Sequence, residues 1–206
     1  KKIMKYIPTI ILTLLCSCSD YLDIVPDNVT TLDIVFNNRN TAERYLANCY
    51  HFVPDHGSVK RIPGMGAGHE CWFYTTNDSH FDNEVSFYIA RGLQNIDAPY
   101  ANYWDGEGGS NLPMFRAIRE CNIFLDYVRD QHKVNDLTDS ERKRWIAEVN
   151  VLKAYYHFFL FEHYGPIPIV DKALPVSTDP EGVKVTRMPV DQIVDYMVKL
   201  IDDSYK

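Results

Sequence analysis

The 206-residue sequence has little of what several common protein classes need. Its apolar stretch near the N-terminus, Tyr6 to Leu15, has ten residues, about half of the ~20 that a membrane-spanning helix requires. Positive charge is not in excess: 21 Lys and Arg against 28 Asp and Glu give a net charge of -7. This balance argues against a nucleic-acid-binding protein, because such a protein neutralises phosphates with a basic surface.

Cysteine patterns and catalytic motifs are also missing. Five cysteines are present, but none are spaced as CxxC, so neither a disulfide framework nor a zinc knuckle is indicated. Cys49 and Cys121 lie on apolar helical stripes, which predicts buried thiols. There is no G-x-S-x-G elbow and no HExxH, and no Gly-Lys-Ser/Thr follows the glycines at 64–68. We therefore predict a protein that is not an enzyme and has no cofactor.

A metal site is weakly indicated at most. His157 and His163 do not have the spacing of a zinc helix, and they lie far apart around a helix of 3.6 residues per turn. Asp78, Asp82 and Glu84 lack the spacing of a calcium-binding loop, so calcium stays a minor alternative at that position.

The N-terminal residues have the pattern of an export signal. Lys1, Lys2 and Lys5 precede the apolar stretch, as in a secretory signal peptide. The sequence Leu15-Cys16-Ser17-Cys18 then fits the frame of a bacterial lipoprotein signal, with Cys18 as the lipidated residue. We expect a signal peptide at 1–17 and a lipidated tether at 18–39. Acidic residues just after Cys18 resemble the signal that sends Bacteroidota lipoproteins to the outer face.

Helical periodicity covers most of the remaining chain. It predicts helices from Asn40 to the residue before Pro54, from about 113 to 131, from Thr138 to the residue before Gly165, and from about 189 onward. Long striped helices with connectors between them favour an all-α, solenoid-like array. Four rings of the third helix, Tyr155, Tyr156, Phe158 and Phe159, cannot all face water, and we expect at least three to be mostly buried.

Residues 54–111 lack this periodicity and are rich in glycine and aromatic residues. We expect an ordered loop insertion there, with a short strand at Val85 to Ile89. Aromatic rings can stack on the CH faces of sugars, while sugar hydroxyls need polar partners. This reasoning selects five candidate ligand-binding residues, which are Trp72, Tyr74, Asn77, Asp78 and Trp104. The alternative for Trp104 is a structural role under the helix at 113–131.

The segment from Trp145 to Val170 reads WIAEVNVLKAYYHFFLFEHYGPIPIV. It resembles the signature of the SusD/RagB family, in which a Leu-x-Ala-Tyr-Tyr-x-Phe core precedes Tyr-Gly-x-(Ile/Val)-Pro. Lys153 stands where the family usually has Arg. The blocks at 18–23, 116–122 and 187–202 also resemble the family's, in the same order, so the resemblance covers nearly the whole chain.

This resemblance implies an all-α fold of tetratricopeptide-like helix pairs. It implies a lipoprotein of the outer membrane that captures glycans as the lid of a TonB-dependent, SusC-like transporter. Some members capture peptides, and a purely structural helical adaptor is a third possibility. Family members continue well beyond this point, so we expect 40–206 to be the N-terminal helical domain of a longer protein.

Overall fold

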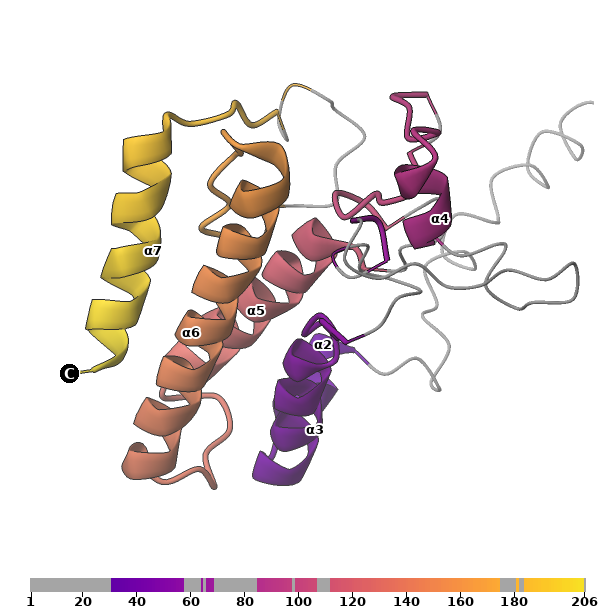
Figure 1. Cartoon of the computed structure of the whole chain (residues 1–206). Coiled ribbons are helices and arrows are strands. Elements are labelled where there is room, and N and C mark those ends of the chain that lie inside the picture. Colours follow the sequence, from indigo (N-terminus) through magenta and orange to yellow (C-terminus); the bar gives the residue numbers. More distant parts are fainter. Residues whose placement is uncertain are drawn as a thin grey trace, which may run out of the picture. The chain divides into compact units, whose positions relative to one another are not determined.

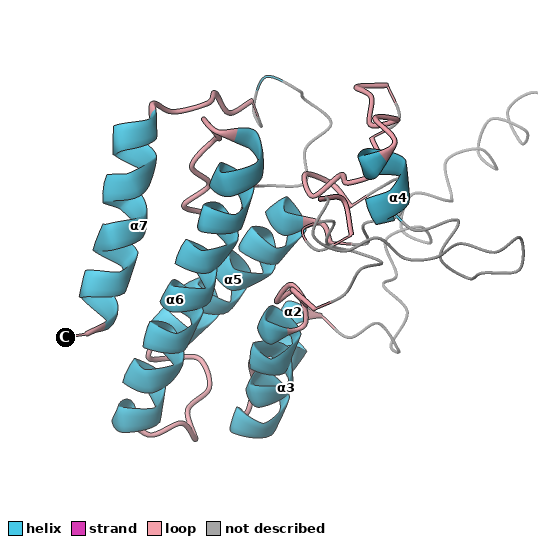
Figure 2. Cartoon of the chain, in the orientation of Figure 1, coloured by secondary structure: helices cyan, strands magenta, loops and turns pink. Residues whose placement is uncertain are grey.

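The computed structural model describes residues 31–57, 64, 66–68, 85–97, 99–106, 112–174, 181 and 184–205. All regular elements in these residues are helices (Figures 1 and 2). They are α2 (Leu32–Val35), α3 (Arg39–Tyr50), α4 (Val85–Ala90), α5 (Met114–Arg129), α6 (Asp139–Tyr164) and α7 (Val190–Ser204). The chain divides into two compact units, 1–34 and 35–206, and helices α3 to α7 all belong to the second unit.

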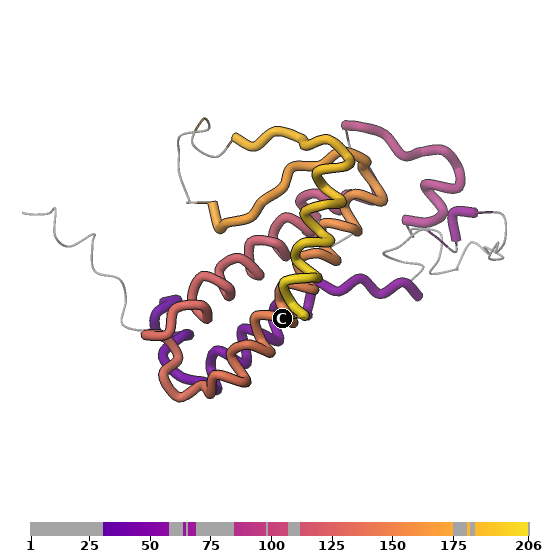
Figure 3. Tube along the Cα trace, turned by 90° about the vertical axis from the view of Figure 1, so that its left-hand side faces the viewer, coloured from indigo at the N-terminus to yellow at the C-terminus, as the bar shows by residue number. Residues whose placement is uncertain are grey.

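Three long helices of this unit lie side by side in chain order. Helix α5 packs against α6 and α6 packs against α7, each antiparallel to its predecessor, while α3 contacts both α5 and α6 (Figures 1 and 3). Successive antiparallel helices agree with the solenoid-like array that the helical periodicity predicted and with the helix pairs that the family resemblance implied. The all-α fold class is therefore confirmed.

Side-chain caps fix where two of these helices begin. Thr138 accepts a hydrogen bond from the backbone N–H of Glu141 at 3.3 Å, so α6 begins where the sequence predicted. Asn38, rather than Asn40, caps α3: its side chain accepts from the N–H of Thr41 at 3.1 Å, so the helix begins earlier than predicted. Both Asn38 and Asn40 are good caps in isolation, and the periodicity alone did not separate them.

The predicted strand at Val85 to Ile89 is wrong. Residues Val85–Ala90 form the short helix α4 instead. β-branched and aromatic residues favour a strand only where a neighbouring strand can pair with the backbone. Within the described residues no such strand exists, and a helix satisfies the same backbone groups locally.

The core lies between α3, α5 and α6. One stripe of α6 is buried, and it consists of Trp145, Val149, Leu152, Tyr156 and Phe159. It faces a stripe of α5 that includes Ile118, Leu125 and Val128. Burial of these side chains is the main source of stability, because apolar area removed from water contributes roughly 25 cal/mol per Å².

A buried arginine holds the loop between α5 and α6 in place. The Arg142 guanidinium donates to the carbonyl oxygens of Val128, Asp130, Lys133 and Val134 at 2.6–3.2 Å. Val134 has a positive φ of 51°, which is unfavourable for a β-branched residue, and its N–H also donates to Phe36. Arg142 thus satisfies the carbonyls at the end of α5 and holds the strained loop.

The four neighbouring rings of α6 do not share one environment. Tyr156 and Phe159 are buried, Tyr155 is partly buried, and Phe158 is 47% exposed. Three of the four rings are therefore mostly buried, as expected, and Phe158 is the exception.

Candidate functional site

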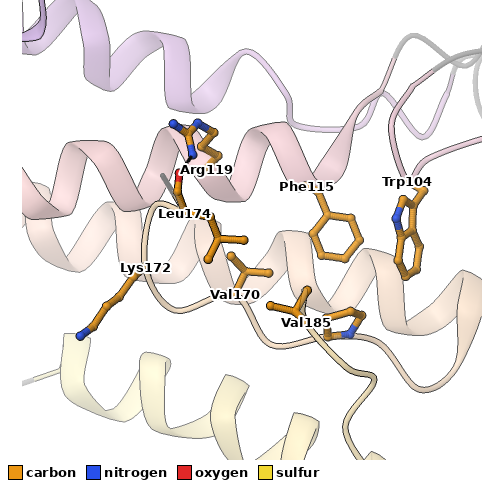
Figure 4. Close-up of a pocket in the computed structure, with 8 residues that line it drawn as sticks. Trp104, Phe115, Arg119, Val170, Lys172, Leu174 and Val185 are labelled. Atoms are coloured by element: carbon orange, nitrogen blue, oxygen red, sulfur yellow. Dashed lines mark hydrogen bonds between the residues drawn. The ribbon is translucent and has the colours of Figure 1, made fainter. Parts of the chain in front are cut away.

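An apolar pocket of about 210 Å³ opens beside the N-terminal half of α5. Its walls come from four parts of the chain: the loop before α5, α5 itself, the segment at 168–174 and Val185. The lining residues are Trp104, Phe115, Arg119, Pro168, Val170, Lys172, Leu174 and Val185 (Figure 4).

Hydrogen bonds fix the loop that carries Trp104. The backbone N–H of Tyr103 donates to the Tyr164 hydroxyl at 2.8 Å, and the N–H of Trp104 donates to the side-chain oxygen of Asn102 at 3.1 Å. The loop must then turn sharply at Gly106, where φ is +84° and an added Cβ would lie 2.8 Å from Cδ of Pro113. Only glycine fits this turn without a shift of the backbone.

The Trp104 ring has neighbours on several sides. Its centroid lies 4.6 Å from the Phe115 ring and 5.6 Å from the Tyr164 ring, which meets it edge-on. The Arg187 guanidinium lies over the indole at 5.2 Å. Trp104 therefore packs on α5, as the structural alternative requires, and it also lines an open pocket, as the ligand-binding hypothesis requires.

The opposite wall of the pocket is the segment that follows α6. Hydrogen bonds to its backbone carbonyl oxygens hold it in place. Asn122 of α5 donates to the carbonyl oxygen of Val170 at 3.0 Å, and Arg119 donates to that of Leu174. The N–H of Met188 donates to the carbonyl oxygen of Ile167 at 2.9 Å. These bonds anchor the extended segment that follows α6 to α5 on one side and to the segment before α7 on the other.

Aromatic and charged groups occupy different ends of the pocket. Trp104 and Phe115 lie together at one end, and Arg119 and Lys172 lie at the other (Figure 4). A ligand with both an apolar face and polar groups would match this division. Rings can stack on the apolar face, while the basic side chains can donate hydrogen bonds.

An ion pair with one buried partner, Lys153, lies next to this wall. The Lys153 ammonium is almost fully buried, and its Nζ lies 2.9 Å from both the carboxylate and the backbone carbonyl of Asp171. Tyr196 of α7 donates to the same carboxylate at 2.8 Å. The three groups join α6, the segment after Val170 and α7.

This ion pair changes the pKa values of its members. Burial lowers the pKa of Lys153, although Asp171 acts in the opposite direction. Partial burial acts to raise the pKa of Asp171, but the Lys153 ammonium and the Tyr196 hydroxyl outweigh it and hold that pKa below its usual value. Lys153 and Tyr196 thus favour the charged form of Asp171, and Asp171 in turn opposes the loss of charge that burial favours at Lys153.

His157 extends the same polar cluster into the core. Its Nδ1 donates to the carbonyl oxygen of Lys153 at 2.7 Å, and its ring lies 5.1 Å from that of Tyr196. Among the described residues, Nε2 has no hydrogen-bond partner. Burial lowers the pKa of His157 to about 4, so the imidazole is neutral at physiological pH.

Trp104 is the one sequence-predicted binding residue that falls within the described residues. Cys18, Trp72, Tyr74, Asn77 and Asp78 lie outside them, as does the calcium alternative. Sequence reasoning missed Phe115, Arg119 and Lys172. Phe115 lies in the helix expected from about 113 to 131, and Lys172 is a loop residue without a motif, so no local signal connected them with Trp104.

Two further properties concern the part of the chain that the structure describes. There, His, Cys, Asp and Glu side chains form no group of three or more that could hold a metal ion. None of the helices in the described ranges combines the length and the hydrophobicity needed to cross a membrane.

Comparisons with known proteins agree with this fold. A family model for SusD-like proteins, described as starch-binding and associating with the outer membrane, matches residues 20–206. A laminarin-binding SusD-like protein of known structure is similar, with a TM-score of 0.61 and 17% identity over 82% of this chain and 34% of the other. A SusD-like protein from Bacteroides fragilis gives a TM-score of 0.59 and 16% identity over 89% of this chain and 31% of the other.

The chain thus spans about a third of the length of these solved structures. No curated protein matches the sequence. The identities are low enough that the two structures speak for the fold alone, whereas the family model extends over nearly the whole sequence. The chain belongs to the SusD-like family.

Proposed function

We propose that this chain is part of a protein that captures oligosaccharides at the cell surface for import, without catalysing a reaction. The observation that supports this function most strongly is the match to a starch-binding, outer-membrane-associating family over residues 20–206. A solved relative with the same fold is named as laminarin-binding.

The pocket beside Trp104 suits one part of such a ligand. A sugar ring has an apolar CH face, which can lie against Trp104 or Phe115, and hydroxyls, for which the lining residues Arg119 and Lys172 offer hydrogen-bond donors. The pocket volume of about 210 Å³ is small, below the ~300–1,000 Å³ of ordinary ligand sites. We therefore assign it one subsite, and propose that Trp72, Tyr74, Asn77 and Asp78 supply further contacts.

A binding screen tests the function directly. The natural protein would be titrated calorimetrically with starch, laminarin and other glucans, with unrelated glycans and with peptides. We expect saturable binding to at least one glycan. Binding to peptides alone would contradict the proposal and favour the peptide-capturing alternative, and no binding to any ligand would favour a structural adaptor.

Two substitutions test the site. Trp104→Ala and Trp72→Ala should each weaken glycan binding by about tenfold, which corresponds to ~1.4 kcal/mol. Tyr205→Ala is the matched control, because it removes a ring that is 93% exposed and lies outside the pocket. If Trp104→Ala binds as tightly as the control, the indole is a structural residue and the pocket is not a subsite.

We further propose that Cys18 carries a lipid anchor and that a TonB-dependent, SusC-like transporter is the partner. Cys18→Ala should abolish labelling with a clickable fatty acid and release the protein from the membrane, whereas Cys16→Ala should do neither. The transporter should be recovered with the tagged protein after mild detergent extraction. Labelling of the Cys18 variant would contradict the lipidation site, and recovery without a transporter barrel would contradict the partner.

A further inference from the structure

The pocket wall at 168–174 has no helix or strand of its own. Every second residue of this segment lines the pocket, and these residues are Pro168, Val170, Lys172 and Leu174. In an extended chain, successive side chains point to opposite sides. Asp171 falls between the lining residues, and its carboxylate is bonded to Lys153 of α6 and Tyr196 of α7. The segment therefore has two sides, one that lines the pocket and one that is attached to the helices.

Bonds from neighbouring helices replace the hydrogen-bond ladder that a strand would have. The carbonyl oxygen of Val170 accepts from Asn122 of α5 at 3.0 Å, and that of Asp171 accepts from Lys153 of α6 at 2.9 Å. The Lys153 ammonium also lies 2.9 Å from the Asp171 carboxylate. Asp171 is thus held through both its backbone and its side chain, which fixes the orientation of the peptide in the middle of the wall.

The burial of Lys153 makes this attachment strong. The Lys153 side chain is 2% exposed, so its charge has little access to water, whereas the Asp171 side chain is 63% exposed. A buried ammonium without a counter-charge is strongly unfavourable, and Lys153 therefore favours the conformation of the wall that brings Asp171 to it. Tyr196 donates to the same carboxylate at 2.8 Å. The wall cannot shift without breaking its contacts with α6 and α7 together.

A wall that is already in place matters for a small binding site. The pocket of about 210 Å³ leaves room for few contacts with a ligand, so binding has little free energy with which to offset the ordering of a loop. A segment that is ordered before the ligand arrives avoids that cost. Val170 and Leu174 then line the pocket together with Phe115 before any ligand binds (Figure 4).

We propose that Asp171 is a positioning residue of this subsite, because it joins Lys153 and Tyr196 and so holds 168–174 in the arrangement that lines the pocket. Its effect on a ligand rests on the proposed capture of glycans, whereas its effect on the order of the wall does not. Asp171 itself contacts no ligand in this proposal. Its loss should therefore reduce affinity through the mobility of the wall and not through a lost contact.

The mobility of the wall is measured first, without a ligand. A nitroxide spin label on Lys172→Cys reports on the wall, in a Cys71→Ser background, because Cys49 and Cys121 are buried and do not react. We expect Asp171→Asn to make this label clearly more mobile in the electron paramagnetic resonance spectrum of the natural protein. Asp195→Asn is the matched control, since it removes an exposed carboxylate of the same helix as Tyr196. An unchanged spectrum in Asp171→Asn overturns the proposal, whether or not a glycan binds.

Affinity then separates positioning from stability. The natural protein and its Asp171→Asn and Lys153→Met variants would be titrated with the starch, laminarin and other glycans of the binding screen. Asp171→Asn leaves a buried charge unpaired and Lys153→Met does not, so the two variants should differ in stability. Both break the link between α6 and the wall, and we expect each to weaken glycan binding by about tenfold at a temperature where both are folded.

The possible outcomes distinguish this proposal from the proposed function. A loss of affinity that follows the loss of stability, with Lys153→Met binding like the control Asp195→Asn, would make Asp171 a structural residue only. Affinities equal to the control in both variants would overturn the positioning role while glycan capture stands. A natural protein that binds none of the glycans would overturn the proposed function and the subsite with it, and the spin-label spectra would still decide whether Asp171 orders the wall.

Discussion

The two sides of helix α6 differ in how completely they are covered. On the side of α3 and α5, Trp145, Tyr156 and Phe159 are buried to at least 98%. On the side shared with α7, Phe158 and Val151 remain nearly half exposed although they are equally apolar. The comparison shows that apolar residues on all sides of a helix indicate that much of its surface is buried, but not which neighbour covers each side.

The largest expected effect is the difference in stability loss between substitutions at two adjacent rings of α6. Phe159→Ala should reduce the free energy of unfolding by ~3–5 kcal/mol, because it removes a buried ring and leaves a cavity. Phe158→Ala in the 206-residue chain should cost less than about 1 kcal/mol, since much of that ring is already in water. Urea unfolding of both variants measures the difference, and equal losses would show that the α6–α7 side is packed as tightly as the core.

Acid should destabilise the folded protein through His157, whose ring lies beside Tyr196 of α7. Its folded pKa of about 4 lies below the ~6.5 of an unfolded histidine, so the unfolded chain binds more protons between these values. Stability is therefore fully retained above pH ~6.5 and falls as the pH drops towards 4, by up to ~3 kcal/mol from this residue.

Melting temperatures between pH 7 and 4 measure this contribution. His157→Phe should flatten that part of the profile, while Lys153, Asp171 and Tyr196, which surround the imidazole, are left in place. His132→Gln, at an exposed position, serves as the control. A profile that stays the same in the His157 variant would mean that other groups carry the acid sensitivity.

The ion pair behind the pocket should respond unequally to the loss of either partner. Asp171→Asn leaves the buried Lys153 ammonium without its counter-charge, and we expect a loss of ~1–3 kcal/mol. Lys153→Met should cost less, because the remaining Asp171 carboxylate is 63% exposed and water can solvate it. Chemical denaturation of both variants provides the test, and a larger loss for Lys153→Met would contradict this account of the pair.

The smallest expected effect is the loss of stability when a helix cap is removed. Thr138→Ala and Asn38→Ala should each reduce stability by ~1 kcal/mol, because each removes the acceptor for a backbone N–H in the first turn. Ser140→Ala, one residue into α6, should change stability by less than about 0.5 kcal/mol. If Asn40→Ala proved as costly as Asn38→Ala, α3 would begin where the periodicity placed it.

Much of the fold could be predicted because its signals are local. The capping pattern at Thr138, the stop at Gly165 and the stripe from Trp145 to Phe159 each depend on residues within a few turns of one another. The predicted strand at 85–89 was wrong because a strand depends on a partner that no local pattern reveals. The candidate site was predicted only in part, through Trp104, because the residues that share its pocket are separated by up to 81 positions in the chain.

By itself, the sequence determined both ends of α6, the periodicity of the buried stripes and the family signature at 145–170, since backbone hydrogen bonds and 3.6-residue spacing act over short distances. The tertiary structure alone decided that Trp104 meets Phe115, that Lys153 is neutralised by Asp171, and that the side of α6 shared with α7 stays partly exposed. These outcomes depend on how whole helices pack, and burial in this chain follows from the neighbours that each side of a helix acquires and not from the apolar character of its residues.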